Sequence, residues 1–271
     1  MRKRTTATTP SGPPEQERPE KDRRFVTALA RGLELLRCFG PGDRQLGNQE
    51  LARRAGLPKP TVTRLTYTLT RLGYLRAAGQ GYALGPGVLA LGYALLAAMD
   101  VRRVARPLMQ HLAEHARASV NLGMRDGLGV VYLDTYRSAS SASVQLDVGS
   151  RLPLAVTSMG RAYLGALTLD ERRPLLEELR RADPDGWPAA RKGIAQALRD
   201  LDRHGFCYSL GDWRKDVHAV AVPLRIADGS DAFVFSCSGP AFEMGRARLE
   251  ADIGPRLLNL VGNVRSALSA P

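Results

Sequence analysis

The sequence has little cysteine and no long hydrophobic run. Its three cysteines, Cys38, Cys207 and Cys237, are odd in number and far apart among the 271 residues, so they predict neither a disulfide framework nor a zinc site. No stretch of about 18 apolar residues occurs, which argues against a membrane-spanning helix. The basic N-terminus is followed by no apolar core, so it is not a secretory signal. We therefore expect a protein of the reducing cytoplasm that has no membrane partner.

Motifs of several enzyme classes are missing as well. There is no G-x-S-x-G nucleophile elbow, and no glycine-rich phosphate-binding motif follows a strand. One pattern does fit a metal site, since His111, Glu114 and His115 form H-x-x-E-H, in which two histidines one helical turn apart can share a zinc ion. No third ligand has the expected context, so we expect a solvated helix face, no metal and no cofactor. A zinc-dependent hydrolase remains the alternative to a protein that is not an enzyme.

Positive charge is concentrated near the N-terminus. The chain carries a net charge of +12, of which residues 25–85 hold nine basic and three acidic side chains, or +6, and residues 1–24 hold +3. Such an excess in a short module is typical of a nucleic-acid-binding protein. Residues 1–24 contain four prolines and no apolar periodicity, which predicts a disordered basic arm.

Apolar spacing predicts three helices in residues 25–85. The first covers residues 25–39, the second residues 49–55 with Asn48 as its cap, and the third begins near Pro60, which suits a first helical turn. Residues 74–84 place a glycine-rich turn between two short apolar runs, which predicts a β-hairpin. Three helices and a hairpin are the order of a winged helix-turn-helix domain. The expected buried positions are Leu29, Leu33, Leu35, Leu36 and Phe39 in the first helix, Leu51, Ala52 and Ala55 in the second, and Val62, Leu65, Leu69 and Leu72 in the third.

The outward face of the third helix carries the side chains that suit DNA reading. Arginine can bind guanine, threonine can contact a thymine methyl group or a phosphate, and a helix N-terminus favours phosphate. The five threonines between residues 61 and 70 are poor helix formers. They are either tolerated on the surface of the helix, or their hydroxyl groups are used in binding DNA. We expect DNA contacts from Asn48, Lys59, Thr61, Thr63, Arg64, Tyr67, Arg71 and Arg76, with Thr70 on the same outward face.

The remainder of the chain predicts a linker and an α+β domain. Residues 88–99 are expected to form an almost wholly apolar helix within a linker, residues 86–100, and we expect a second subunit to cover it. Residues 101–271 alternate helical and strand patterns, which predicts one mostly antiparallel sheet with helices. Expected helices cover residues 102–117 (with Val104, Leu108 and Leu112 inward), 159–167, 170–181, 188–204 and 246–268, and expected strands cover 120–124, 129–133, 144–148, 206–210, 217–224 and 232–237.

Several segments in register resemble the isocitrate lyase regulator (IclR) family of transcription regulators. They are Asn48 to Leu65, resembling the helix-turn-helix of that family; Gly149 to Leu154 with Gly160-Arg161-Ala162, resembling its G-x-x-x-P-L and G-[KR]-A signature; and two late strands, Val217 to Pro223 and Ser236 to Pro240. The resemblance covers about residues 25–268. It implies a winged-helix domain, a dimerising linker helix, a GAF-like sensor domain, and a dimer or a tetramer of two dimers.

The resemblance also implies a pocket for a small organic acid, either aromatic or a short keto acid. Residue chemistry agrees, because a helix that starts near Ser158 and two serines on one face of a strand can hold a carboxylate in an apolar cup. The segment from Asp212 to Asp216 is expected to be a surface loop, although its tryptophan could rim the pocket. The pocket residues implied are Val144, Ser158, Met159, Val217, Ala219, Ser236 and Ser238.

The leading hypothesis is a homodimeric regulator that binds an approximately palindromic double-stranded DNA operator. The effector would prefer one arrangement of the sensor dimer and so alter the spacing of the two reading helices. A DNA-binding protein without a ligand is a further alternative.

Overall fold

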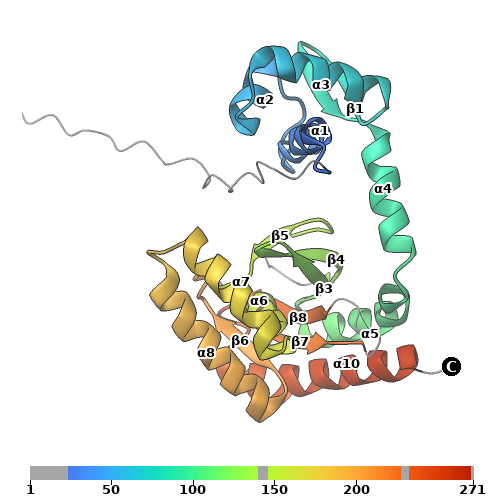
Figure 1. Cartoon of the computed structure of the whole chain (residues 1–271). Coiled ribbons are helices and arrows are strands. Elements are labelled where there is room, and N and C mark those ends of the chain that lie inside the picture. The colour runs from blue at the N-terminus through green and yellow to red at the C-terminus, as the bar shows by residue number, and fades with distance from the viewer. Residues whose placement is uncertain (1–23, 140–145, 227–231, 270–271) are drawn as a thin grey trace, which may run out of the picture. The chain divides into compact units, whose positions relative to one another are not determined.

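The computed structural model describes residues 24–139, 146–226 and 232–269 (Figure 1). The chain forms two compact units, one that ends at Ala98 and one that begins at Met99, and each is described by itself below. No helix within the described ranges is long and apolar enough to cross a membrane.

The N-terminal unit has the predicted order of three helices and a hairpin. An isolated bridge between Leu46 and Tyr82 adds a third short strand segment to the hairpin. The elements are α1 (Thr27–Arg37), α2 (Asn48–Ala55), α3 (Lys59–Arg71), the antiparallel strands β1 (Leu75–Ala78) and β2 (Gly81–Leu84), and α4 (Pro86–Ala97).

The core of this unit confirms part of the predicted stripes and corrects the rest. Leu35, Leu51, Val62, Leu69 and Leu75 are buried together. The stripe predicted for α1 is wrong in part, because Leu29 and Leu33 are exposed. Leu35 is buried as expected, and Leu36 and Phe39 are half-buried against the core, so α1 buries the side that carries Gly32 and Leu35. A row of leucines on a helix does not reveal whether it faces the core of its own unit or another surface.

The predicted seam of α3 is wrong at its C-terminal end. Leu72 lies beyond the last helical residue and is exposed, so the helical spacing no longer applies to it. Thr66 is instead fully buried on the inward face. Its hydroxyl donates to the carbonyl oxygen of Val62 at 3.0 Å, which lets a polar side chain occupy the core without an unsatisfied group.

Helix α4 has no buried residue in the chain. Leu89, Leu91, Tyr93 and Leu95 are all exposed on it, although its sequence is almost wholly apolar. A helix of this composition exposes a large apolar surface to water, which is unfavourable by about 25 cal/mol for each Å² left uncovered.

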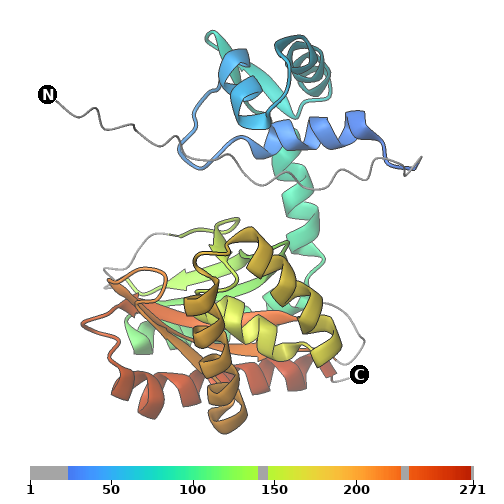
Figure 2. The same ribbon diagram turned by 60° about the vertical axis from the view of Figure 1, so that its left-hand side comes forward.

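The C-terminal unit is built on one six-stranded antiparallel sheet with the order β5-β4-β3-β8-β7-β6. Helix α6 lies against one face, while α5 and α10 pack together across the other (Figures 1 and 2). The strands are β3 (Ser119–Asp126), β4 (Gly129–Arg137), β5 (Arg151–Pro153), β6 (Cys207–Leu210), β7 (Val217–Leu224) and β8 (Phe233–Pro240), and the helices are α5 (Asp100–Ala116), α6 (Ser158–Ala166), α7 (Leu169–Ala182), α8 (Trp187–His204) and α10 (Gly254–Ser269).

Three expectations for this unit need correction. The strand expected at residues 144–148 is not formed at 146–148, the part that lies within the described ranges, and the strand beside β4 is β5. On α5 the inward row is Val101, Ala105, Met109 and Leu112, so the expectation is confirmed for Leu112, while Val104 and Leu108 are only half-buried. The closing helix is interrupted, since α9 (Arg246–Arg248) is followed by a π-helical turn, Leu249–Ile253, before α10 begins.

Candidate functional sites

The exposed face of α3 carries most of the side chains predicted to read DNA. Lys59, Thr63, Arg64, Tyr67 and Arg71 are exposed along this helix. Arg76 is exposed on β1, whereas Thr61 and Thr70 are half-buried. The structure thus brings five of the predicted residues onto one helix and places a sixth on the hairpin beside it.

Three threonine hydroxyls of α3 are already bonded within the helix. Thr63, Thr66 and Thr68 each donate to the carbonyl oxygen four residues earlier, at 3.0 Å in every case. Such bonds let threonine occupy a helix at little cost, because the hydroxyl is satisfied locally. Thr63 therefore offers mainly its methyl group, since its oxygen also accepts from Asn48. The exposed donors on this face are Lys59, Arg64, Tyr67 and Arg71.

Asn48 does not cap α2 as the sequence predicted. The cap position is Gly47, which makes no side-chain bond, and Asn48 is the first helical residue. Its Nδ2 donates to Oγ1 of Thr63 at 3.2 Å, so it joins α2 to α3. Its Nδ2 is thus committed to the fold, and its Oδ1 is buried without a hydrogen-bond partner among the described residues, so the predicted DNA contact of Asn48 stays a prediction.

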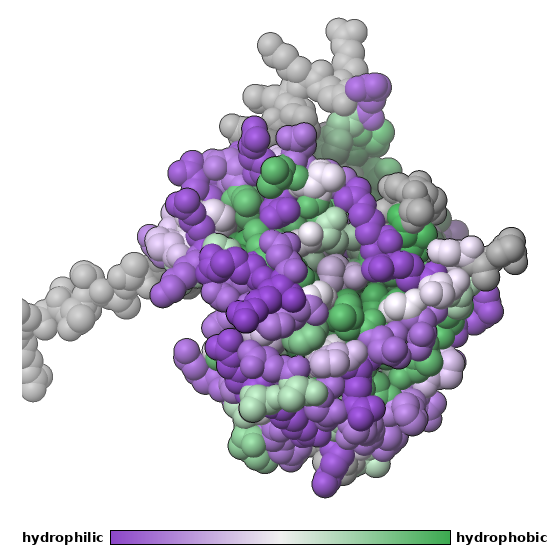
Figure 3. All heavy atoms as spheres, turned by 90° about the horizontal axis from the view of Figure 1, so that it is seen from below, coloured by the Kyte–Doolittle hydropathy of each residue, from purple (hydrophilic) through white to green (hydrophobic). Residues whose placement is uncertain are grey.

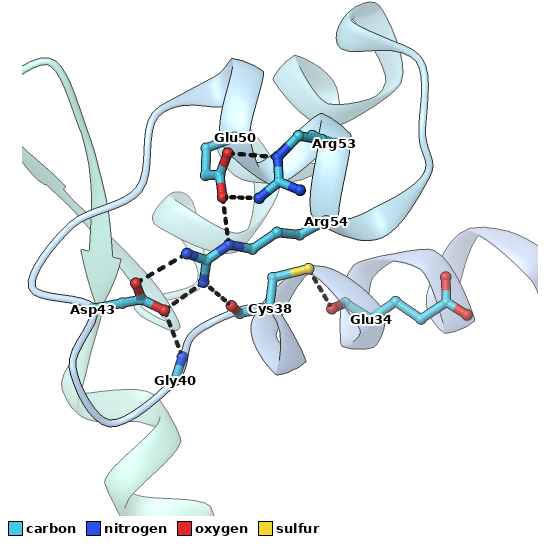
Figure 4. A network of polar contacts seen from close by, with 7 residues as sticks. All are labelled: Glu34, Cys38, Gly40, Asp43, Glu50, Arg53 and Arg54. Atoms are coloured by element: carbon cyan, nitrogen blue, oxygen red, sulfur yellow. Dashed lines mark hydrogen bonds and ion pairs between the residues drawn. The ribbon is translucent and has the colours of Figure 1, made fainter. Parts of the chain in front are cut away.

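A network of charged side chains fixes α2 against the loop that follows α1 (Figure 4). Arg54 donates to Glu50 at 2.7 Å, to Asp43 at 2.5 Å and to the carbonyl oxygen of Cys38 at 2.9 Å. Arg53 makes a two-bond contact with the same Glu50, at 2.9 and 2.5 Å. The bonds from Arg53, which have the larger effect, and the bond from Arg54 lower the pKa of Glu50 to about 2.

The same network decides which basic groups of the N-terminal unit remain for a phosphate backbone. Arg53 and Arg54 are paired with Glu50 and Asp43, so the four charges cancel locally. The excess of positive charge that the sequence showed is therefore supplied by other basic side chains. Lys59, Arg64 and Arg71 on α3 belong to this group.

The C-terminal unit contains a cavity between the sheet and the N-terminus of α6. Of the seven predicted pocket residues, six line it: Ser158, Met159, Val217, Ala219, Ser236 and Ser238. The seventh, Val144, lies outside the described residues. Residues from α6, β7 and β8 that are far apart in sequence are thus brought to one cavity. Its described lining contains no aspartate or glutamate.

The floor of the cavity is a polar network centred on Asn121 of β3. Its Nδ2 donates to the hydroxyl oxygens of Ser236 at 3.2 Å and Ser238 at 3.3 Å, while its Oδ1 accepts from Thr135 at 2.7 Å. Tyr132 lines the same cavity, and its burial raises the pKa of its hydroxyl, which keeps the phenol neutral. These groups form a neutral, hydrogen-bonded floor beneath an otherwise apolar cavity.

The wall opposite this floor is the first turn of α6. Thr157 caps the helix, and its hydroxyl accepts from the backbone N–H of Gly160 at 3.1 Å. The backbone N–H groups of Ser158 and Met159 lie in the same first turn, before Gly160. The N–H groups in the first turn of a helix have no acceptors within the helix. A helix N-terminus of this kind favours an anion in the cavity.

The segment 212–216 is not merely a surface loop, contrary to the expectation. Trp213 and Arg214 line the cavity, and Trp213 also packs against the buried core. Asp212 in the same loop pairs with the buried Arg161 of α6 at 2.5 Å. Gly193 of α8 makes room for that guanidinium, because a Cβ there would lie 2.2 Å from Nη2 of Arg161.

Sequence reasoning missed several lining residues. Asn121 and Tyr132 could have been found, because a polar residue between apolar neighbours in a strand suggests a buried partner. Thr157 could have been found as a helix cap, because threonine is common at that position. The loop of Trp213 and Arg214 was considered as a rim of the pocket, but its charged composition favoured a surface loop. Apart from Trp213, the residues of the cavity that the sequence did not predict are Ser119, Asn121, Tyr132, Leu146, Leu152, Thr157, Ser209 and Arg214.

The H-x-x-E-H segment lies on α5 beside α10 and is used structurally. His115 bonds to Asp252 at 3.1 Å, and Glu114 accepts from the hydroxyl of Ser138 at 3.1 Å. Among the described residues, no cluster of three or more histidine, cysteine, aspartate or glutamate side chains could hold a metal ion. Seen from below, this side of the molecule is covered mostly by hydrophilic residues, with hydrophobic ones showing between them (Figure 3).

Comparison with known protein families matches both units. Residues 28–79 match the IclR helix-turn-helix domain, and residues 93–264 match the C-terminal domain of the bacterial transcriptional regulator IclR. The HTH-type transcriptional regulator TsaQ1/TsaQ2 of Comamonas testosteroni is 36% identical over 250 residues, which cover 91% of this chain and 90% of that protein.

Solved structures give the same result. The crystal structure of an IclR family transcriptional regulator from Brucella abortus is 51% identical, with a TM-score of 0.81, and the match covers 92% of this chain and 95% of that one. An IclR homologue from Microbacterium hydrocarbonoxydans, in complex with 4-hydroxybenzoate, shares the fold at 22% identity with a TM-score of 0.71, covering 90% of this chain and 100% of that chain.

Proposed function

The chain belongs to the IclR family of bacterial transcriptional regulators, which are DNA-binding proteins and not enzymes, and we propose that it controls transcription in response to a small organic acid. The acid would bind in the cavity of the C-terminal unit, and DNA would be read by α3. We infer that the protein acts in the bacterial cytoplasm, where the DNA is.

The observation that carries the ligand proposal is the composition of the cavity. Its described lining combines several hydroxyl groups, one arginine and the first turn of α6 with apolar side chains, and it contains no carboxylate. Groups of this kind bind an organic anion, because donors meet the carboxylate while Met159, Leu152 and Trp213 cover an apolar remainder. The 4-hydroxybenzoate bound by the Microbacterium homologue is an acid of this class.

The DNA proposal rests on the exposed face of α3 and on the apolar surface of α4. We propose that two copies of the chain join through α4, since an isolated helix with no buried residue and four large exposed apolar side chains is covered only by a partner. A two-fold dimer presents α3 twice, so the operator would be approximately palindromic, with half-sites one helical turn or a multiple of it apart. A tetramer of two such dimers is compatible with the same contact.

Footprinting on the DNA upstream of the gene for this protein tests both parts. We expect a protected, approximately palindromic segment, and a change in the protein concentration needed for protection when the correct acid is added. Protection that no acid alters would instead favour a DNA-binding protein without a ligand. Thermal denaturation with aromatic and keto acids provides a second measurement, because any ligand that binds only the folded state raises the unfolding temperature.

A further inference from the structure

The sheet side of the cavity carries a row of small side chains. Ser119, Ser238, Ala219 and Ser209 are paired with one another across β3, β8, β7 and β6, and all four line the cavity. Side chains that are paired directly across neighbouring strands lie on the same face of a sheet, so this row forms a shallow surface. The room left for a ligand is therefore decided by the larger side chains that stand opposite this row.

Met159 is the long side chain that α6 contributes to the cavity. It is 1% exposed and belongs to the same buried cluster as Val130, Tyr132 and Leu152. Its methyl group lies against Gly123 of β3, because a Cβ at that glycine would be 2.9 Å from Cε of Met159 and 2.7 Å from Cγ1 of Val130. The missing side chain of Gly123 thus gives the end of Met159 a close-fitting seat in the core.

The space that remains beside Met159 is small. The cavity has a volume of about 50 Å³. A cavity of about 150 Å³ binds benzene, whereas ~10–15 Å³ is enough for one water molecule. The cavity therefore has room for about four groups of the size of water, which suits a carboxylate on a chain of one or two further carbon atoms. An aromatic ring does not fit in this volume.

The place of Met159 on α6 makes it the wall that a ligand meets first. The backbone N–H groups of the first turn of α6, those of Ser158 and Met159 among them, favour the anionic end of a ligand. Because the side chain of Met159 leaves from the same turn, whatever is attached to that anion contacts its thioether. Moving this side chain aside would empty the seat at Gly123 and leave a void in the core, which destabilises a packed protein.

We propose that Met159, seated against Gly123, is the specificity-determining residue that restricts the effector to acids of two or three carbon atoms and excludes aromatic acids. The inference rests on the proposed function, namely that the cavity binds the acid effector. It selects one of the two ligand classes that the family resemblance implied. A shorter side chain at position 159 would open the cavity toward Gly123 and admit a ring.

Isothermal titration calorimetry on the full chain at pH 7, where carboxylic acids are ionised, tests the proposal. The probes are acetate, propionate, butyrate, pyruvate and benzoate. The wild-type protein is expected to bind at least one of the two- and three-carbon acids more tightly than benzoate. The side chain of Met159→Val is too short to reach Gly123, and this variant is expected to shift the ratio of the two dissociation constants toward benzoate by at least about tenfold, the usual effect of methylene-sized space in an apolar pocket.

Two variants serve as matched controls. Met159→Leu nearly conserves the volume of the side chain and should keep the wild-type ratio. Met109→Val makes the test substitution at a fully buried methionine of α5 that is absent from the described lining, and it should keep the ratio as well.

If Met159→Val does not fold, the wild-type series from acetate through butyrate to benzoate replaces it. Its affinity should be highest at two or three carbons and at least about tenfold lower for benzoate. Tighter binding of benzoate than of every short acid by the wild type, or an unchanged ratio in a folded Met159→Val protein, overturns this inference and leaves the acid-binding pocket intact. A wild-type protein that binds none of these acids overturns the proposed ligand class and this inference together.

Discussion

Arg161 and Asp212 form an ion pair of unequal burial. The side chain of Arg161 is 5% exposed and that of Asp212 is 44% exposed, with 2.5 Å between Nη1 and Oδ2. Arg161 belongs to α6, whose first turn lines the cavity, and Asp212 precedes Trp213 in the loop that lines it. The pair therefore ties two walls of the proposed effector pocket to each other.

The two partners of this pair should respond differently to substitution. Asp212→Ala leaves the buried guanidinium of Arg161 with only the carbonyl oxygen of Ala155 as a bonded partner, so we expect a loss of about 2–4 kcal/mol in the free energy of unfolding. Arg161→Met leaves behind a carboxylate that already meets water, and we expect a loss of less than about 2 kcal/mol. Urea denaturation of both variants measures the difference, and equal losses would show that the pair is not the main interaction.

Arg64 on the exposed face of α3 is expected to determine sequence preference. Arg64→Ala should weaken binding to the operator by about 1–3 kcal/mol and leave the affinity for unrelated DNA much less changed. Lys59→Ala should weaken binding to all duplexes by a similar factor. It should also reduce the slope of the logarithm of the affinity against the logarithm of the salt concentration by about one, as expected for a phosphate contact.

Fluorescence anisotropy over a range of salt concentrations separates these effects. Arg180→Ala is the matched control, since it removes one positive charge from an ion pair with Glu177 on α7 of the C-terminal unit. It should change neither affinity. An Arg64→Ala protein with wild-type affinity for its operator would remove this residue from the reading face.

Helix α4 is expected to hold the dimer together. Leu89 is 75% exposed in the chain, and Leu89→Glu would place a charge in the proposed contact, so sedimentation velocity should show a shift from dimer toward monomer. Leu169 on α7 is 73% exposed and makes the matched control, because Leu169→Glu changes the same chemistry outside α4. Dissociation by both variants, or by neither, would place the subunit contact elsewhere.

The network around Arg54 predicts a dependence of stability on pH. The pKa of Glu50 is lowered to about 2 in the folded chain, from 4.5, chiefly by hydrogen bonds from Arg53 and then from Arg54. Because the folded value lies below the unfolded one, the network stabilises the fold fully above pH 4.5, and this contribution is lost as the pH falls toward 2.

Differential scanning calorimetry between pH 6 and 2.5 tests this dependence. The unfolding temperature of the wild type should fall more steeply below pH 4.5 than that of Glu50→Gln, which cannot titrate at this position. Parallel curves for the two proteins would show that the carboxylate of Glu50 does not contribute in this range.

The sequence predicted the fold well where a pattern depends on local spacing. The three helices, the hairpin and most elements of the sheet domain follow from apolar periodicity and, for the hairpin, from the glycine-rich turn within residues 74–84. It failed where packing decides the outcome. The apolar side chains of α1 and α5 have a helical period, but only packing against neighbouring elements leaves Leu29 and Leu33 exposed and buries Met109.

The pocket was predicted to a similar extent. Motifs placed Ser158, Ser236 and Ser238, because their segments have recognisable local patterns. Asn121 and Trp213 reach the same cavity through strand pairing and loop packing, which connect residues that are distant in sequence. The π-helical turn, Leu249–Ile253, breaks a continuous helical pattern that gave no indication of it.

The affinity of the purified protein for its operator, with and without the acid that stabilises it most, is the most direct measurement of the whole account. We expect binding to one approximately palindromic duplex to exceed binding to unrelated duplexes by at least about a thousandfold at physiological salt, and the acid to change the specific affinity by about fivefold or more. Equal, weak affinity for every duplex, unchanged by any acid that the protein binds, would contradict it.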